Sequence, residues 1–450
     1  MRSVKRHVAV LALAAATWAM STSVWGLPSV PSSTFEPAEG CGCHAALYDQ
    51  WQASMHAKAL TDPLYLYKLA EADKATNGAL GPFCNGCHGP VAVMAGEVRG
   101  TDISKASQQA RQGVTCDLCH QVVGTRGKLG NTSIEVQPDG VKRAQLKDAV
   151  SPSHATAYSA FHESAEFCGN CHNVDHPVNG MHLEMTYTEW KNGPYAKQGI
   201  VCQDCHMTPG PGVTKPNPGK AAAGGPERPH IYTMTFAGGN VGLGDAARAE
   251  ERLKAAAEVS IEVPEIVQPG AQAVATVTVT NVGAGHYLPT GLTEVRQMWL
   301  TVEVVDTAGK TVASTRHDYG TVLKDAKGNH PVELWDAVAI HSDDRIPPKG
   351  SSTDTIAFAM PNAAVTVRAA LYYRSAPEEM AKKAGVEIPT TEMAKVEKAV
   401  YASADEKARA AAPPAPPSGA GAGGLLTWIA AAAVLVGGIV AGFLIARKRA

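Results

Sequence analysis

Eight of the ten cysteines recur in one short pattern: two cysteines separated by two residues and followed directly by a histidine. The four copies are Cys84-Asn-Gly-Cys87-His88, Cys116-Asp-Leu-Cys119-His120, Cys168-Gly-Asn-Cys171-His172 and Cys202-Gln-Asp-Cys205-His206. A disulfide framework gives no reason for a histidine after every second cysteine, and zinc ribbons do not require that histidine. Covalent haem attachment explains each part, because two thiols bond one edge of a porphyrin and the next imidazole binds the iron. The sequence therefore predicts four haem c groups, with these four histidines as proximal iron ligands.

A fifth site departs from the pattern. In Cys41-Gly-Cys43-His44 only one residue separates the cysteines, and Gly40 stands where the first thiol is expected. We expect a fifth haem here, held by Cys43 alone or by the contracted pair, with His44 as the iron ligand. An unmodified pair of cysteines and a free thiol at Cys41 are the alternatives.

An iron that only transfers electrons needs a sixth ligand, and imidazoles outside the motifs can supply it. His56 lies at helical spacing after the first site, and His154 and His162 are eight residues apart, about two helical turns and so on one face. His230 follows Arg-Pro, and His286 lies in Gly-His-Tyr-Leu-Pro-Thr-Gly. We expect these five histidines to be distal ligands, without assigning any of them to a particular iron. His176 and His182 are weaker candidates, and His317, His330 and His341 are expected to be solvated.

Both ends of the chain have the composition of targeting segments. Residues 1–26 have a basic start and an apolar run too short to span a bilayer, which predicts a secretory signal peptide. Residues 425–446 are uncharged and apolar, and long enough to cross a bilayer as a transmembrane helix. A Pro/Gly/Ala linker, 411–424, precedes this helix, and the basic tail 447–450 follows it, so the positive-inside rule places the tail in the cytoplasm. We expect a single-pass protein of the cytoplasmic membrane with its other domains in the periplasm or at the cell surface; such a tail can also be a sorting signal that is later removed.

Between the two ends the composition changes once. Residues 27–243 hold every haem motif and lack long apolar periodicity, so we expect short helices and loops around porphyrins that supply the apolar interior. Residues 255–375 have no cysteine and contain β-branched, often alternating segments separated by turn signals. The segments are 259–263, 273–282, 298–305, 355–359 and 365–373. They predict an antiparallel β-sandwich of immunoglobulin-like architecture, and residues 376–410 are expected to be helical. The predicted fold is thus multidomain: a mainly α and loop multihaem cytochrome domain, a β-sandwich and a C-terminal transmembrane helix.

Parts of the haem region resemble the cytochrome c-554 and c-prime type of multihaem cytochrome. The resemblance rests on the stretches from Cys43 to His56, from Phe167 to His172, from Thr186 to Tyr195 and from Cys202 to Met207. This group is related in haem packing to hydroxylamine oxidoreductase and pentahaem nitrite reductase. The resemblance covers about residues 36–240 and implies closely packed haem pairs, mostly bis-histidine ligation, and electron transfer. The contracted cysteine site departs from the family pattern.

We therefore expect an electron-transfer protein that links a quinol oxidoreductase or a soluble cytochrome to a terminal reductase or an external acceptor. The alternative is an enzyme that reduces a small nitrogen or sulfur oxide or oxyanion at a five-coordinate haem, although no Cys-x-x-Cys-Lys site is present. A structural role in a filament of stacked haem domains is a third reading. No catalytic residue is assigned. A formal net charge of -2 gives no electrostatic basis for nucleic-acid binding.

Overall fold

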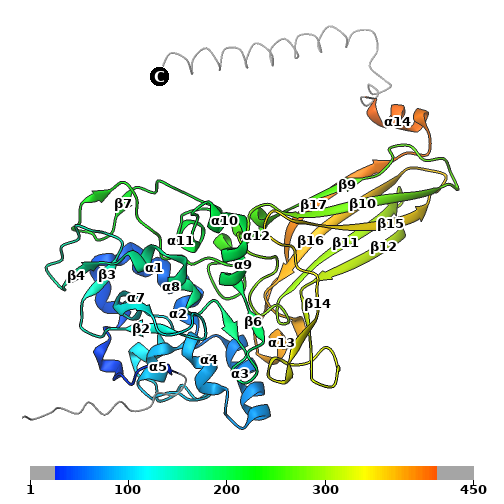
Figure 1. Ribbon diagram of the computed structural model, residues 1–450. Helices are drawn as coiled ribbons and strands as arrows, with labels where there is room; N and C mark the ends of the chain where they lie inside the picture. The colour runs from blue at the N-terminus through cyan, green and yellow to red at the C-terminus, as the bar shows by residue number, and fades with distance from the viewer. Residues whose placement is uncertain (1–25, 413–450) are drawn as a thin grey trace, which may run out of the picture.

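The computed structural model describes residues 26–412, so the predicted membrane span and nearly all of the predicted signal peptide lie outside the described residues. No helix between residues 26 and 412 is long and apolar enough to cross a membrane. The described chain forms a region of short helices and loops joined to an elongated β-sheet region (Figure 1).

The first region is built from short helices, as the sequence predicted. The longest is α3, with 14 residues and Asp62 as its N-cap. The helices are η2 (Ser32–Thr34), η3 (Ala38–His44), α1 (Ala45–Ala53), α2 (Met55–Lys58), α3 (Pro63–Thr76), α4 (Gly81–His88), α5 (Pro90–Met94), α6 (Gln108–Arg111), α7 (Cys116–Gln121), η4 (Ala160–Glu163), α8 (Ala165–Gly169), α9 (Thr186–Asn192), α10 (Pro194–Lys197) and α11 (Cys202–His206). Four two-stranded ribbons complete it: β1 (Val122–Thr125) with β2 (Ile134–Val136), β3 (Lys142–Ala144) with β4 (Thr156–Tyr158), β5 (Val174–Asp175) with β6 (His182–Glu184), and β7 (Gly219–Lys220) with β8 (Glu227–Arg228).

Each cysteine motif lies on or beside a short helix, which explains how its side chains share one edge. Residues three apart lie on the same face of a helix, so α4, α7 and α11 present both thiols of a motif in one direction. The motif at Cys168 begins in α8, and the contracted motif ends η3. The region also has a small apolar core of its own, with Leu60 and Val91 fully buried.

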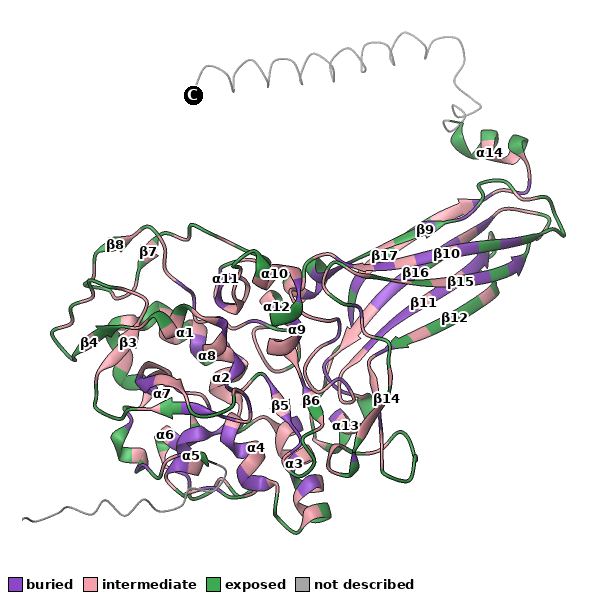
Figure 2. Cartoon of the chain, in the orientation of Figure 1, coloured by how far each residue is buried: buried purple, intermediate pink, exposed green. Residues whose placement is uncertain are grey.

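The second region is a sandwich of two antiparallel sheets. One sheet has the strand order β15-β10-β9 and the other β12-β11-β16-β17. The elements are α12 (Ala246–Ala256), β9 (Ala257–Glu262), β10 (Gln272–Asn281), β11 (Gln297–Asp306), β12 (Thr311–Tyr319), β13 (Thr321–Lys324), η5 (Leu334–Asp336), β14 (Ala339–Asp343), β15 (Ser351–Ala359), β16 (Val365–Arg374), α13 (Glu378–Lys383), β17 (Thr391–Val400) and α14 (Ala404–Ala411). Buried and exposed residues alternate along β10, and the inward side chains of both sheets form one core (Figure 2).

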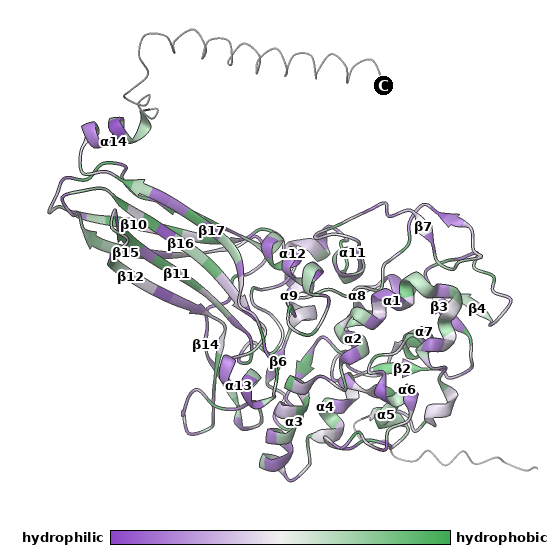
Figure 3. Ribbon diagram, turned by 180° about the vertical axis from the view of Figure 1, so that it is seen from behind, coloured by the Kyte–Doolittle hydropathy of each residue, from purple (hydrophilic) through white to green (hydrophobic). Residues whose placement is uncertain are grey.

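The five predicted strand segments are all strands, but the predicted helix over 376–410 is wrong in its middle. Residues 391–400 form β17, which pairs with β16 along its length and extends the sandwich beyond residue 375. The segment is rich in Ala, Lys and Glu, which favour helix, yet Thr391 and Met393 are buried against the core. Pairing with a neighbouring strand outweighs this local preference. Viewed from behind, the strands carry hydrophobic and hydrophilic residues in mixed order (Figure 3).

The two regions contact each other along several elements. Leu64 of α3 packs in one apolar cluster with Ala376 and with Ala381 of α13. Lys68 of α3 forms an ion pair of 2.5 Å with Glu333. These contacts hold α13 and the segment before η5 against α3 of the haem-motif region.

Candidate multihaem site

The five cysteine motifs are named here sites 1 to 5 in chain order, with proximal histidines His44, His88, His120, His172 and His206. Four of these rings place Nδ1 on a backbone carbonyl. The contacts are His44 to Ala221 at 2.7 Å, His88 to Ala59 at 3.0 Å, His120 to Arg143 at 2.7 Å and His206 to Ala237 at 2.8 Å. A carbonyl only accepts, so Nδ1 carries the proton and Nε2 keeps its lone pair. This is the arrangement that second-shell partners impose on metal-binding histidines.

Four proximal histidines face a second histidine at nearly one spacing. The ring centroids lie 6.3 Å apart for His44 and His154, 6.2 Å for His172 and His56, 6.1 Å for His120 and His162, and 6.2 Å for His206 and His286. An imidazole nitrogen binds a metal at about 2.0 Å and lies about 1.1 Å from its ring centroid. Two imidazoles on opposite faces of one iron therefore have centroids about 6.2 Å apart. The spacing fits an iron porphyrin between each pair.

The structure thus brings four of the five predicted distal histidines to a proximal histidine, and each goes to a different site. His154 and His162 do not share a helix face as the spacing suggested, because His154 is in a loop and His162 lies in η4, with β4 between them. The order of residues along the chain does not indicate that His56 lies opposite His172, the proximal histidine of site 4.

His230 is the exception, because no ring contact among the described residues brings it to a proximal histidine, and its role as a distal ligand stays a prediction. Its ring has Tyr232 as neighbour, edge to face, and none of the proximal histidines. Its Nδ1 accepts a 3.0 Å hydrogen bond from the Asn217 backbone N–H, and its Nε2 is buried without a hydrogen-bond partner among the described residues.

Site 2 lacks an imidazole partner among the described residues. His88 stacks face to face on Tyr65, with centroids 3.7 Å apart and ring planes within 4°. That spacing leaves no room for a porphyrin between the two rings, so Tyr65 packs beside the proximal ligand and is not the sixth ligand. The Tyr65 hydroxyl donates to Asn85 Oδ1 at 2.6 Å, which fixes the phenol. Burial raises the pKa of Tyr65 well above its usual value, so the phenol stays protonated.

Site 4 differs from the other sites in its second-shell partner. Here the Nδ1 of His172 faces a carboxylate, Glu184 Oε1, at 3.8 Å. Burial lowers the pKa of His172, but Glu184, with smaller contributions from Cys87 and Cys202, outweighs this effect and raises the pKa to about 9. The carboxylate therefore favours positive charge on this imidazole and on any metal bound to it.

The attachment cysteines of neighbouring sites lie next to one another. A hydrogen bond from the Cys116 thiol lowers the pKa of Cys41, which joins sites 1 and 3. Equivalent contacts with Cys171 and Cys168 lower the pKa of Cys87 and of Cys202, which join site 4 to sites 2 and 5. Porphyrins bonded to adjacent thiols would have adjacent edges, so a haem at site 4 would adjoin those at sites 2 and 5.

The residues that the sequence did not predict contact the proximal histidines from outside the motifs. Tyr65 and Glu184 contact their histidines from another helix or strand, and neither belongs to a motif with fixed spacing. The spacing of the cysteine and histidine motifs does not predict a role for Tyr65 or Glu184.

Comparison with known proteins agrees with this geometry. Residues 41–121 match the family model described as cytochrome c554 and c-prime. The fold is similar to the crystal structure of a penta-heme cytochrome c552 from Thermochromatium tepidum, with a TM-score of 0.61 and 19% sequence identity, over 83% of this chain and 99% of that chain. The CARDB domain of the PF1109 protein from Pyrococcus furiosus is similar over 32% of this chain and 90% of that chain, at 15% identity and a TM-score of 0.18. No curated protein matches the sequence. One stretch of the chain thus matches a cytochrome c family, and the fold is similar to that of a penta-heme cytochrome.

Proposed function

We propose that the protein transfers electrons outside the cytoplasm through closely spaced haems, most of them bound by two histidines. The observation that carries the proposal is the set of four proximal and distal histidine pairs with ring centroids 6.1 to 6.3 Å apart. Two imidazoles occupy both axial positions of an iron, which leaves no position for a substrate and suits electron transfer.

The adjacency of the sites supports a continuous route for electrons. Site 4 has cysteine neighbours in sites 2 and 5. The hydrogen bond to Cys202, burial and, as a smaller effect, nearby Cys119 raise the pKa of Cys168, which also brings site 3 close to site 4. Site 1 adjoins site 3. Electrons entering at site 1 would reach site 4 through site 3 and could then pass to site 2 or site 5.

The mass of the purified holoprotein, read beside its absorption spectrum in both oxidation states, tests this proposal. We expect four or five covalently attached haems, most of them low-spin, and rapid re-oxidation of the reduced protein by an external acceptor. Reduced protein that no acceptor re-oxidises, or a colourless product, would contradict electron transfer.

Reduction of a small nitrogen or sulfur oxide or oxyanion at site 2 is a second candidate function. The observation that favours it is the missing imidazole partner of His88, because an iron with an open face can bind a ligand. We expect one high-spin haem in the oxidised protein, which cyanide converts to low-spin. Variants that lack the distal histidine of another site should keep this high-spin signal. A fully low-spin protein that does not react with cyanide would exclude catalysis at site 2.

For location and partners, we propose a membrane-tethered protein with the haem and β regions outside the cytoplasm. The support is the apolar segment 425–446, the basic tail and the need for haem c attachment outside the cytoplasm. A tether would keep the haems near a quinol oxidoreductase or a terminal reductase and raise their effective concentration. Membrane fractionation of the full chain beside a chain ending at residue 412 tests the tether: only the full chain should sediment with membranes.

A further inference from the structure

We propose that Glu189 is the positioning residue for His286, the sixth-ligand candidate of site 5, and that it acts by pinning the loop from the β region. The inference deepens the proposed function and rests on its axial pairing of His206 with His286. Of the four paired distal histidines, only His286 comes from beyond the haem-motif region, on the loop between β10 and β11. Site 5 is therefore complete only when the two regions are docked.

The loop is anchored to the sandwich on one side. Asn281 Nδ2 donates to the backbone oxygen of His286 at 2.9 Å. Leu288 exchanges two backbone hydrogen bonds with Ile346, at 2.9 and 2.8 Å. These contacts define the shape of the loop but not its place relative to His206.

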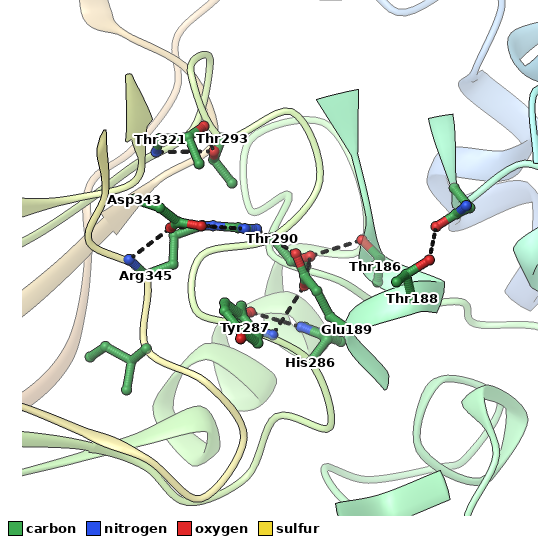
Figure 4. Close-up of polar contacts among 12 residues, drawn as sticks. Thr186, Thr188, Glu189, His286, Tyr287, Thr290, Thr293, Thr321, Asp343 and Arg345 are labelled. Atoms are coloured by element: carbon green, nitrogen blue, oxygen red, sulfur yellow. Dashed lines mark hydrogen bonds and ion pairs between the residues drawn. The ribbon is translucent and has the colours of Figure 1, made fainter. Parts of the chain in front are cut away.

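Glu189 of α9 supplies contacts between the loop and the haem-motif region, beside a 2.9 Å hydrogen bond between the Thr186 and Thr290 hydroxyls (Figure 4). Its Oε2 accepts the Tyr287 backbone N–H at 3.1 Å and the Thr290 hydroxyl at 2.6 Å. Its Oε1 accepts from the guanidinium of Arg345. One carboxylate thus holds three groups of the β region, and the first of them belongs to the residue directly after His286.

The ion pair between Glu189 and Arg345 is buried. The side chains of Glu189 and Arg345 are 5% and 8% exposed. Arg345 also forms two hydrogen bonds of 2.8 Å with Asp343, one to each carboxylate oxygen, and lies 5.0 Å from the Tyr287 ring centroid. Arg345 therefore keeps a charged partner when Glu189 is removed. Loss of Glu189 should release the loop without leaving an uncompensated buried cation.

The geometry of iron binding explains why such an attachment matters. An iron–imidazole bond tolerates little change from about 2 Å, so a loop displaced by an ångström loses the bond. Glu189 touches neither the porphyrin position nor His286 itself. Its effect is transmitted through the backbone of Tyr287 and the Thr290 side chain.

Carbon monoxide binding to the fully reduced holoprotein tests the inference, because it counts irons with an available sixth position. Wild type should bind about one molecule per chain, at site 2, and both His286→Ala and Glu189→Ala should bind about two. Glu189→Gln keeps an oxygen for Tyr287 and Thr290, so it should bind about one molecule rapidly, as wild type does. Slow binding of a second molecule, as carbon monoxide displaces His286, should be on the order of tenfold faster in Glu189→Gln than in wild type. Lys68→Ala, which breaks another ion pair between the two regions, is the matched control and should behave as wild type.

The possible outcomes distinguish a failure of the role proposed for Glu189 from a failure of the axial pairing of His206 with His286. If His286→Ala binds no more carbon monoxide than wild type, the axial pairing at site 5 is wrong and the inference fails with it. If His286→Ala gains one molecule and Glu189→Ala, still folded, does not, Glu189 is only an interface residue. Should Glu189→Ala fail to incorporate haem, the uptake rate of Glu189→Gln decides: an unchanged rate overturns the inference.

Discussion

The carboxylate beside His172 provides a quantitative prediction about the potential of one haem. Glu184 Oε1 lies 3.8 Å from Nδ1 of His172, and its side chain is 10% exposed. The imidazole adds about 2.2 Å between its nitrogens and the iron bond about 2 Å, which puts the charge about 8 Å from the iron. At an effective dielectric constant of about 20, a unit charge at that distance contributes about 2 kcal/mol. The carboxylate stabilises the more positive ferric state, so Glu184→Gln should raise the site 4 potential by up to about 90 mV.

The assay is a spectroelectrochemical titration of wild type and Glu184→Gln, with haem content matched. Glu166→Gln is the control, because Glu166 accepts from the Tyr187 hydroxyl at 2.9 Å and forms no hydrogen bond or ion pair with a proximal histidine among the described residues. Its side chain is 40% exposed and pairs with Lys191, so water and the cation screen its charge, and its effect should be much smaller. A site 4 potential that falls, or one that changes no more than in Glu166→Gln, would refute the electrostatic argument.

Three further changes probe other parts of the molecule. Burial raises the pKa of Glu294 to about 7 from the usual 4.5, and its Oε1 has no hydrogen-bond partner among the described residues. The protonated side chain therefore stabilises the fold fully below pH 4.5. This contribution, at most about 3 kcal/mol, is lost as the pH rises through 7. Denaturant unfolding at pH 5 and pH 8 should show Glu294→Gln losing less stability than wild type, and equal losses would contradict this. His154→Ala should convert site 1 from low-spin to high-spin, whereas an unchanged spectrum would mean that His154 and His44 do not share an iron or that site 1 carries no haem. Leu371→Ala, at a fully buried position of the sandwich, should cost about 2 to 5 kcal/mol without altering the haem spectrum, and a changed spectrum would show that the two regions are more tightly coupled than their contacts indicate.

The sequence was sufficient for features that depend on local spacing. A cysteine motif works within five adjacent residues, so its chemistry can be predicted without knowing the fold. The β-branched segments 259–263 and 273–282 likewise form strands where alternation predicted them. Residues 391–400 were misread because their helix-forming composition is local, while the pairing with β16 that makes them a strand is not.

Tertiary structure alone decided which groups meet across the chain. His56 precedes His172 by more than a hundred residues and still faces it, and His286 reaches His206 from another region. Such pairings depend on how loops and helices pack in three dimensions, and no periodicity in the chain encodes them. The same holds for Glu184 and Glu189, whose carboxylates act on histidines or loops far away in sequence. Motif chemistry is determined by covalent neighbours, whereas axial pairing and its tuning are determined by packing.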